Sequence, residues 1–526
     1  MADANRAMAR EDAPEISRWL VTASIILGTL MGAIDMSIIN VALPNIRASL
    51  GVTLTEVSWV ATGYLVAVVV ILPLTSWLAA VVGRKNLYLA ALVVFAAASF
   101  GCGLSRTLPT LLFFRLLQGL GAGLMQPIAQ AVLRESFPPA EQAMAMGIFG
   151  IAILLGPAVG PTLGGWLTDN YGWPWIFFIN IPIGAVAFFM ASQFLWDPPY
   201  LKRQTVRDVD YWGITLLTVG LAALQTVLSE GQSKEWFEST FVVGLTALAA
   251  VALVAFVAWE LRVSKPAVDL TILSNTSYTS GTMLGGVLGL TLFGSMFLLP
   301  LFMQGLLGYD AMQSGIAMLP RSLVMMVAMP IAGRIYNRVG PRLMIGFGLA
   351  LSAMAAFQMG LFTADTSLAG LIIPQAWQGL AFSFIFVSLS TAALAAVPRS
   401  RMTNATALYN LVRQLGGSFG IAALATLLEN RQSLVGAILN ERINAYNPAF
   451  LQRYSALSQG LFMQGVVPSE AGQKSLALFS GMVQQQAAVM SFEYVFTVIG
   501  ITFVVTLPLV FLLKSRREAI PSVVVD

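Results

Sequence analysis

The sequence predicts an all-helical integral membrane protein whose fourteen transmembrane helices form two six-helix halves with two extra helices between them. The first reason is length: apolar stretches of about 20 residues, enough to cross a bilayer, recur along the 526-residue chain. The second is composition, because 57% of the residues are hydrophobic and only 10% are charged, whereas soluble domains carry roughly 25% charged residues. The third is an internal repeat, in which short patterns return about 260 residues later.

The apolar stretches predict where the chain crosses the membrane. The predicted spans are residues 19–42, 57–80, 86–105, 109–133, 143–168, 173–196, 211–230, 240–262, 279–304, 313–335, 342–363, 369–395, 404–430 and 492–513. They divide the chain into an N-terminus (1–18), a six-helix half (19–200), two extra helices with linkers (201–275), a second six-helix half (276–513) that includes a long outer loop (431–491), and a tail (514–526). The first span begins near Trp19 and is expected to serve as an uncleaved signal.

The basic residues predict the orientation of the spans. Of the 29 Lys and Arg residues, nineteen fall in the N-terminus, in loops that follow even-numbered spans, or in the C-terminal tail. Cytoplasmic loops of membrane proteins carry an excess of Lys and Arg. Both termini and these loops are therefore expected on the cytoplasmic side, and the even number of spans agrees with this.

The internal repeat consists of three patterns in the same order in both halves. The turn Gly83-Arg84-Lys85 returns as Gly340-Pro341-Arg342, Gln118-Gly119 returns as Gln378-Gly379, and Gly156 returns as Gly416. The offsets are 257, 260 and 260 residues, so the two halves run in parallel orientation. Parallel halves with a binding site between them near the bilayer midplane are typical of one large class of secondary transporters.

One acidic residue, Asp35, lies deep within a predicted span. A carboxylate inside a membrane is costly, so its default interpretation is a functional site. Arg115 in span four lies at a similar depth, within roughly 3 Å along the helix rise, so the two charges can pair if their helices are neighbours. Burial favours the neutral acid and a guanidinium favours the carboxylate. Two roles stay open: a proton carrier with Arg115 as electrostatic partner, and a permanent clamp between two helices.

Other polar residues interrupt the apolar spans only sparsely. Gln118 follows Arg115 by three residues and shares its helix face. Arg413 can contact a substrate, donate a hydrogen bond to a backbone carbonyl, or extend to the membrane–water interface. Whether Arg413 or Arg321 contacts the substrate stays open. These groups are predicted to line a substrate cavity or to support its conformational change: Asn40, Gln118, Gln378, Asn410, Arg413 and Gln414.

Span five carries the most specific pattern of the chain, with a small residue at every fourth position. The pattern consists of Gly156, Pro157, Gly160, Pro161, Gly164 and Gly165. One face of this helix is therefore nearly bare backbone, and each proline removes a helix hydrogen bond. The pattern favours a hinge or sliding contact between the two halves, and equally a tight packing seam.

Two turns on the predicted cytoplasmic side carry basic residues. They are formed by Gly83, Arg84 and Lys85 and by Gly340 and Arg342. Such residues can pair with carboxylates or with the C-terminal ends of neighbouring helices, which predicts an inner gate. Orientation alone also explains positive charge at these turns.

Several kinds of chemistry are not supported by the sequence. The chain has one cysteine and no histidine, so neither an internal disulfide nor a thiolate or imidazole metal site is expected. There is no phosphate-binding G-x-x-x-x-G-K loop, and the Gly-rich run after Arg115 follows no strand. We therefore expect no enzyme activity, no catalytic or metal-binding residues, no bound cofactor and no nucleic-acid partner.

The predicted outer loop 431–491, which connects spans thirteen and fourteen, is unusually long. Long loops of this kind are usually functional or disordered. Residues 469–490 have the pattern of an amphipathic helix, so the loop is expected to dock on a partner protein or to lie on the membrane surface.

Together these motifs resemble the major facilitator superfamily, in particular its fourteen-span drug:proton antiporters and the EmrB-like inner-membrane permeases among them. The resemblance covers nearly the whole chain and rests on residues 35–44, 83–85, 115–123, 156–165, 175–184 and 409–420. The chain departs from the family's first cytoplasmic turn, where Ser76 and Ala80 replace Gly and Asp.

The resemblance implies a bacterial inner-membrane protein that exports structurally varied lipophilic or amphipathic drugs, driven by the proton gradient. It further implies a periplasmic adaptor of the EmrA type and an outer-membrane channel of the TolC type. The alternatives are an exporter of one specific metabolite or siderophore, a nutrient importer, and a receptor or enzyme lodged in the bilayer. The span-five pattern resembles that of exporters and favours export.

Overall fold

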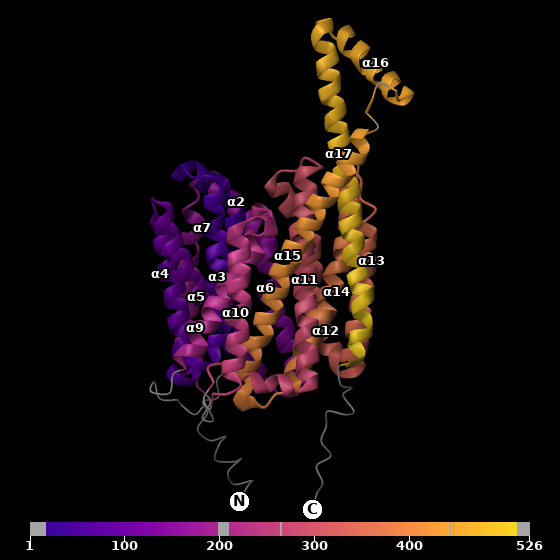
Figure 1. Cartoon of the computed structure of the whole chain (residues 1–526). Coiled ribbons are helices and arrows are strands. Elements are labelled where there is room, and N and C mark those ends of the chain that lie inside the picture. Colours follow the sequence, from indigo (N-terminus) through magenta and orange to yellow (C-terminus); the bar gives the residue numbers. More distant parts are fainter. Residues whose placement is uncertain (1–16, 198–209, 264–265, 442, 445, 513–526) are drawn as a thin grey trace, which may run out of the picture.

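The computed structural model describes residues 17–197, 210–263, 266–441, 443–444 and 446–512, which form helices and no strand (Figure 1). Fourteen of the described helical segments are long and apolar enough to cross a membrane, so the predicted number of spans is confirmed. In Figure 1 we call the end where α2 begins and η6 ends the lower end, and the end from which α16 projects the upper end.

The N-terminal half is built around α2, which packs against α6 and α8, while α5 packs against α3 and α4. Its elements are α2 (Arg18–Leu50), α3 (Leu54–Val82), α4 (Arg84–Leu104), α5 (Leu108–Ser136), α6 (Gln142–Tyr171), α7 (Trp175–Phe178) and α8 (Asn180–Phe194). The connections are short and specified locally. Gly51 adopts a left-handed φ of 65°, and Thr53 and Glu56 form a reciprocal capping box that starts α3.

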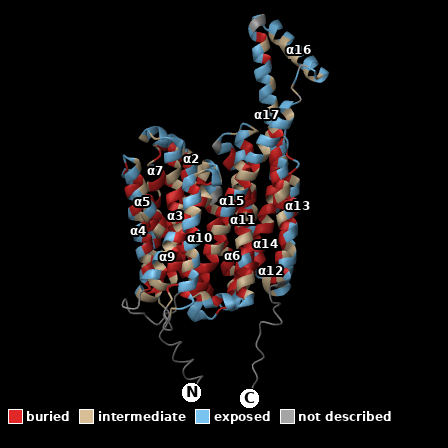
Figure 2. Ribbon diagram, viewed as in Figure 1, coloured by how far each residue is buried: buried red, intermediate tan, exposed pale blue. Residues whose placement is uncertain are grey.

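Two further helices pack against each other, and α9 also packs against α3. They are α9 (Tyr211–Glu230) and α10 (Thr240–Glu260), and the short helices η2 (Gln232–Lys234) and η3 (Trp236–Glu238) join them. The carboxylate of Glu230 accepts hydrogen bonds from the hydroxyls of Ser58 and Thr62, at 3.3 and 2.8 Å. These bonds hold α9 on the N-terminal half. Many apolar residues of α10, such as Val251 and Val254, are exposed (Figure 2), as expected for a helix that faces lipid.

The C-terminal half repeats the arrangement of the first, with α11 packed on α15 and α14 packed on α12 and α13. Its elements are η4 (Leu270–Ser274), α11 (Thr276–Gly305), α12 (Ala311–Val339), α13 (Pro341–Met359), α14 (Leu368–Ala395), η5 (Arg399–Arg401), α15 (Met402–Glu441), α16 (Pro448–Met463), α17 (Pro468–Thr506) and η6 (Leu507–Leu512). The side chains of Asn275, Asp310 and Ser367 cap the first turns of α11, α12 and α14.

The two halves meet along α6 and α12 and where α15 packs against α3 and α5. Glycines permit close approach here. A Cβ on Gly147 of α6 would lie 2.8 Å from the carbonyl oxygen of Met329, and a Cβ on Gly333 of α12 would lie 2.6 Å from the Cα of Met144. These separations are shorter than real Cβ contacts, so both positions require glycine.

Helices α15 and α17 extend well beyond the predicted membrane segments. The sequence prediction ended span thirteen at residue 430 and began span fourteen at residue 492, whereas α15 continues to Glu441 and α17 begins at Pro468. With α16 they form a projection at the upper end (Figure 1). Hydropathy locates only the part of a helix that lies in lipid, so it does not extend the two spans into their polar continuations. The amphipathic pattern at residues 469–490 agrees with the helix that begins at Pro468.

Candidate functional site

Asp35 lies at the centre of a buried hydrogen-bond network inside the N-terminal half. Arg115 Nη1 donates to Asp35 Oδ2 at 2.7 Å, and both side chains are fully buried. Oδ1 of Asp35 accepts from Gln118 Nε2 at 2.7 Å and from Asn180 Nδ2 at 2.9 Å. Gln118 and Asn180 both also donate to Ser99 Oγ, at 2.6 and 3.0 Å. The structure thus brings together Asp35, Arg115 and Gln118, and adds two residues from α4 and α8.

Arg115 is held on several sides besides the carboxylate. Its Nε donates to the carbonyl of Val60 at 3.1 Å, and its Nη1 also donates to Gln118 Oε1 at 2.8 Å. Its guanidinium carbon lies 4.3 Å from the centre of the Tyr64 ring, a favourable cation–π arrangement. Charge-assisted hydrogen bonds are about twice as strong as neutral ones, so these contacts offset part of the cost of burying the charged pair. Nη2 of Arg115 has no hydrogen-bond partner among the described residues.

Asn180 lies where the sixth span is briefly interrupted. The break falls at Ile179, between α7 and α8. Pro182 lacks the N–H that would bond the carbonyl of Phe178, and its ring crowds that carbonyl, which disturbs the helix at this point. Asn180 therefore becomes the first residue of α8 and is 1% exposed.

The sequence did not single out Asn180 or Ser99. Asn180 could have been found, because it is the one amide residue in residues 173–191, which are otherwise apolar. Ser99 carries no such signal, since a serine inside a membrane helix commonly bonds its own backbone. Its role here depends on where α4 packs, which no local pattern determines.

The glycines of α6 pack against α2 next to Asp35. A Cβ on Gly156 would collide with the backbone of Ala33, one on Gly160 with the side chain of Ser37, and one on Gly164 would lie 2.9 Å from the carbonyl oxygen of Ile38. Ser37 Oγ donates to the Gly156 carbonyl at 2.8 Å.

Of the two roles that the pattern left open, the tight packing contact is the one seen here, because the bare face of these glycines packs against α2 within the N-terminal half. A hinge or sliding role between the halves stays a prediction. A Cβ on Gly165 would approach only Val41, at 3.8 Å, so this position is less crowded. Pro161 lies in the same helix and is partly buried, and the side chain of Pro157 lies outside the described residues.

The basic turns at the lower end make their contacts inside each half. Arg84 Nη1 donates to Glu135 Oε2 at 2.6 Å, and Lys85 Nζ donates to the carbonyl of Ser192 at 2.7 Å. Gly83, with φ at 92°, lets the backbone N–H of Lys85 reach Asp197 Oδ1 at 2.8 Å.

In the C-terminal half the corresponding turn holds Gly340, with φ at 85°, and Arg342, whose Nη2 donates to the carbonyl of Phe511 at 3.3 Å. The expected pairing with carboxylates and helix ends is thus present, and none of these contacts bridges the two halves. A gate role for these residues stays a prediction.

A different set of residues joins the halves toward the lower end. Asn410 Nδ2 donates to Gln130 Oε1 at 2.7 Å, and Arg413 Nη2 donates to Asn410 Oδ1 at 3.0 Å and to Gln126 Oε1 at 3.4 Å. Arg134 Nη1 donates to the carbonyl of Thr391 at 3.2 Å. The sequence prediction included Asn410 and Arg413 but missed their partners on α5, which are polar residues near the end of a span and carry no distinguishing pattern.

The remaining predicted cavity residues do not join either network. Asn40 lies on an exposed face of α2, Gln414 is buried on α15, and Gln378 is buried on α14 without a hydrogen-bond partner among the described residues. Nor does the described part of the chain place three potential ligands from His, Cys, Asp and Glu together for a metal ion.

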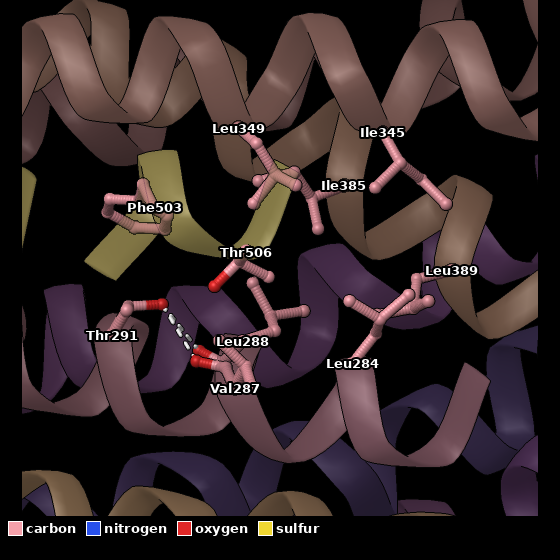
Figure 3. Close-up of a pocket in the computed structure, with 10 residues that line it drawn as sticks. All are labelled: Leu284, Val287, Leu288, Thr291, Ile345, Leu349, Ile385, Leu389, Phe503 and Thr506. Carbon is pink, nitrogen blue, oxygen red and sulfur yellow. Dashed lines mark hydrogen bonds between the residues drawn. The ribbon is translucent and has the colours of Figure 1, made fainter. Parts of the chain in front are cut away.

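The interior cavity in Figure 3 is unsuited to a polar or bulky ligand. It lies between α11, α13, α14 and α17 and holds about 10 Å³, which is room for no more than one water molecule. Thr291 Oγ1 donates to the carbonyls of Val287 and Leu288, and Thr506 Oγ1 donates to that of Thr502. Both hydroxyls are therefore already bonded within their own helices, and the other lining residues are apolar.

Comparison with known proteins decides the family. The sequence pattern of the Major Facilitator Superfamily matches residues 25–421. The chain belongs to this superfamily. It is 34% identical over 496 residues to the multidrug export protein EmrB of Escherichia coli (strain K12), a match that covers 94% of this chain and 95% of EmrB. It is also 34% identical over 495 residues to the fatty acid resistance protein FarB of Neisseria gonorrhoeae, covering 94% and 96% of the two chains.

A solved structure supports the same fold. The human organic anion transporter MFSD10 superimposes with a TM-score of 0.59 at 14% sequence identity, covering 95% of this chain and 100% of that one. At this identity the likeness concerns the fold alone. The predicted resemblance to EmrB-like permeases is thus confirmed, as is the fold class. This member of the major facilitator superfamily is a multi-pass membrane transporter and not an enzyme.

Proposed function

We propose that this transporter exports lipophilic and amphipathic drugs by exchange with protons, through alternating access, with Asp35 as the proton carrier and Arg115 as its electrostatic partner. The observation that carries the proposal is the Asp35 network, in which a buried carboxylate has one cationic and two amide partners. A neutral Asp35 keeps acceptor capacity for the amides but loses its charge pair with Arg115. Protonation therefore changes the contact between α2 and α5.

The contact between the glycines of α6 and helix α2 offers a route by which this change can be coupled to movement of the halves. On one face α6 packs bare backbone against Ala33 and Ser37 of α2, two residues to either side of Asp35. On another face α6 packs against α12 of the opposite half, where Gly147 meets Met329. A helix that is in close contact with both can transmit a shift at one face to the other. We infer that α6 links the ionisation of Asp35 to the rocking of the two halves.

The proton gradient is the proposed energy source, with no bound cofactor. One elementary charge moving through 100 mV releases about 2.3 kcal/mol, so a single proton supports a drug gradient of roughly fifty-fold. The buried polar residues at the interface of the halves, Asn410 and Arg413 among them, are proposed to support the closed state toward the cytoplasm.

Proteoliposomes test whether transport is coupled to protons. We expect that adding a lipophilic cationic dye, such as ethidium, to vesicles with an imposed pH gradient moves dye and protons in opposite directions, read by dye fluorescence and by trapped pyranine. Nigericin, which dissipates the pH gradient, should stop net dye accumulation. Dye movement that is insensitive to nigericin and unaccompanied by a pyranine signal would contradict antiport.

We further propose that the protein lies in the bacterial inner membrane, surrounded by lipid, with the lower end in the cytoplasm. The support is the excess of basic residues there, including Arg84, Lys85, Arg338 and Arg342. This orientation places the projection of α15, α16 and α17 in the periplasm. Cysteine residues introduced at positions 338 and 459 test it, since only the second should react with an impermeant maleimide in intact spheroplasts.

The projection is the proposed docking site for a periplasmic adaptor of the EmrA type, which would connect the transporter to an outer-membrane channel of the TolC type. Apolar side chains are exposed on it, among them Phe462 at 56% and Met463 at 87%. A groove of about 940 Å³ also lies between the three helices, lined partly by Leu457, Leu461 and Met482. Exposed apolar area of this kind marks interaction surfaces.

Removing residues 440–485 is expected to weaken adaptor capture more than folding. Leu439 and Gln486 both line the groove, so the cut ends lie near each other and a short Gly-Ser linker can join them. We expect loss of adaptor co-purification, while dye transport in proteoliposomes, which needs no adaptor, is retained. Adaptor capture at the wild-type level by the shortened protein would contradict the proposed docking site.

An exporter of one specific metabolite or siderophore is the alternative function on the same scaffold. A transport screen across chemically unrelated compounds separates the two, because a specific exporter would move one compound class only.

A further inference from the structure

A group of buried polar side chains lies where α12 packs against α14 in the C-terminal half. Arg321 is 1% exposed, and Gln375 and Gln378 are 0% and 1% exposed. The two helices are in close contact here: a Cβ on Gly379 would lie 3.1 Å from the carbonyl carbon of Arg321, and Gln375 Nε2 donates to the carbonyl of Ala317 at 2.8 Å. We call Arg321, Gln375 and Gln378 the α12–α14 cluster.

Arg321 differs from the other four buried arginines of the described chain. Those four each donate to an acceptor: Arg84 and Arg115 to carboxylates, Arg134 to a carbonyl and Arg413 to amide oxygens. The three guanidinium nitrogens of Arg321 have no hydrogen-bond acceptor among the described residues. Arginine keeps its charge in proteins, and a buried charge without a partner is costly. The position therefore calls for an anion.

The internal repeat indicates the chemistry of that anion. Its offsets of 257 and 260 residues pair Tyr64 with Arg321, Arg115 with Gln375, and Gln118 with Gln378. In the N-terminal half the Tyr64 ring covers Arg115, while Arg115 and Gln118 both hold the carboxylate of Asp35. In the C-terminal half the counterpart of α2 is α11, which contains no Asp or Glu. This cluster thus has the cationic and amide groups of the first site without its carboxylate.

We propose that the α12–α14 cluster binds the carboxylate of an amphipathic substrate, in the place that the Asp35 carboxylate takes in the N-terminal half. This inference rests on the proposed function and names a substrate class for it. A guanidinium fork matches a carboxylate in a two-pronged contact, and the amide N–H groups of Gln375 and Gln378 supply further donors. The proposal also explains why the C-terminal half keeps a buried arginine to which no described residue offers a hydrogen-bond acceptor.

The depth and the local helix geometry fit such a site. Arg321 is the tenth residue after the start of α12 at Ala311, about 15 Å along the helix and thus near the middle of a roughly 30 Å hydrocarbon layer. Binding sites of transporters built from repeats lie at this level. Pro320 and Pro374 directly precede Arg321 and Gln375 inside their helices, and a helix bends readily at proline. In the proposed binding step, bending at these points opens the contact to a ligand.

Two probes of opposite charge and equal apolar size test the proposal. They are pyrenebutyrate and pyrenebutyl-trimethylammonium, titrated onto the full-length protein in nanodiscs of zwitterionic lipid, where no lipid anion competes. We expect Arg321→Met to weaken pyrenebutyrate binding by roughly tenfold to a hundredfold and to leave the cationic probe unaffected. The control is Arg106→Met, which removes an exposed arginine in the loop between α4 and α5 and should change neither affinity. Arg321→Lys should restore part of the pyrenebutyrate affinity.

Thermal stability without ligand gives a second, independent readout. A buried charge that is kept for ligand binding lowers the stability of the ligand-free protein, so Arg321→Met should raise its melting temperature. Pyrenebutyrate should stabilise the wild type but not this variant. A lowered melting temperature together with equal loss of both probes would show that Arg321 holds the fold, and would overturn the proposal. Unchanged pyrenebutyrate affinity in Arg321→Met would also overturn it. If the protein bound pyrenebutyrate through Arg321 but moved no protons, the carboxylate site would be supported and the proposed antiport would be rejected.

Discussion

Replacing Asp35 by asparagine is expected to abolish proton-coupled transport while the protein still reaches the membrane. The amide of asparagine keeps the size of the side chain and one acceptor oxygen, but it cannot exchange a proton. In proteoliposomes the substrate-driven pyranine signal should fall to the level of empty vesicles. Asp365→Asn is the matched control, because it makes the same change in an exposed residue of the loop between α13 and α14.

The variant also leaves Arg115 buried without its charge partner, which costs about 3–5 kcal/mol when a buried pair is broken. A second variant separates this cost from the loss of coupling. Asp35→Asn combined with Arg115→Gln removes both charges, so it should recover most of the stability while coupling remains absent. If this neutral pair restored drug-driven proton movement, the pair would be a structural clamp and the proton would be carried elsewhere. Retained coupling in Asp35→Asn alone would lead to the same conclusion.

The sequence predicted the part of this site whose residues are costly in a membrane. A single deep carboxylate and a buried arginine at similar depth stand out by composition alone, so Asp35 and Arg115 were found, and the structure places them 2.7 Å apart. Asn180 and Ser99 were missed because neutral polar groups are common in spans and gain meaning only from their neighbours. Whether the residues act in proton coupling stays a prediction.

The fold was predictable for a related reason. Hydropathy averages over every residue of a span, and the repeat consists of three patterns in the same order. The number of spans and the division into two halves therefore do not depend on any single residue. Which face of a helix meets which neighbour depends on the whole packing. The span-five pattern therefore showed that a close contact exists, whereas only the structure shows that Gly156 and Gly160 meet Ala33 and Ser37 of the same half.

Replacing Gly156 by leucine is expected to disrupt both stability and transport, because the new side chain has no space. Its Cβ alone would overlap the backbone of Ala33, so α2 and α6 must separate. The hydrogen bond from Ser37 Oγ to the Gly156 carbonyl would then be lost as well. Overpacking of this kind typically costs 1–3 kcal/mol. We therefore expect a lower melting temperature and roughly a tenfold or greater loss of transport rate.

The control for this change is Gly346→Leu in α13, where a Cβ meets no atom within 4 Å. Both variants add the same side chain to the interior of a transmembrane helix, so they differ only in what that side chain contacts. Gly156→Ala should already show part of the effect, since the Cβ is the atom that collides. Equal behaviour of Gly156→Leu and Gly346→Leu would mean that the contact between α2 and α6 is loose in the working protein. In that case α6 could not transmit the ionisation of Asp35 to α12, and the coupling route would have to run through α5, where Arg115 is located.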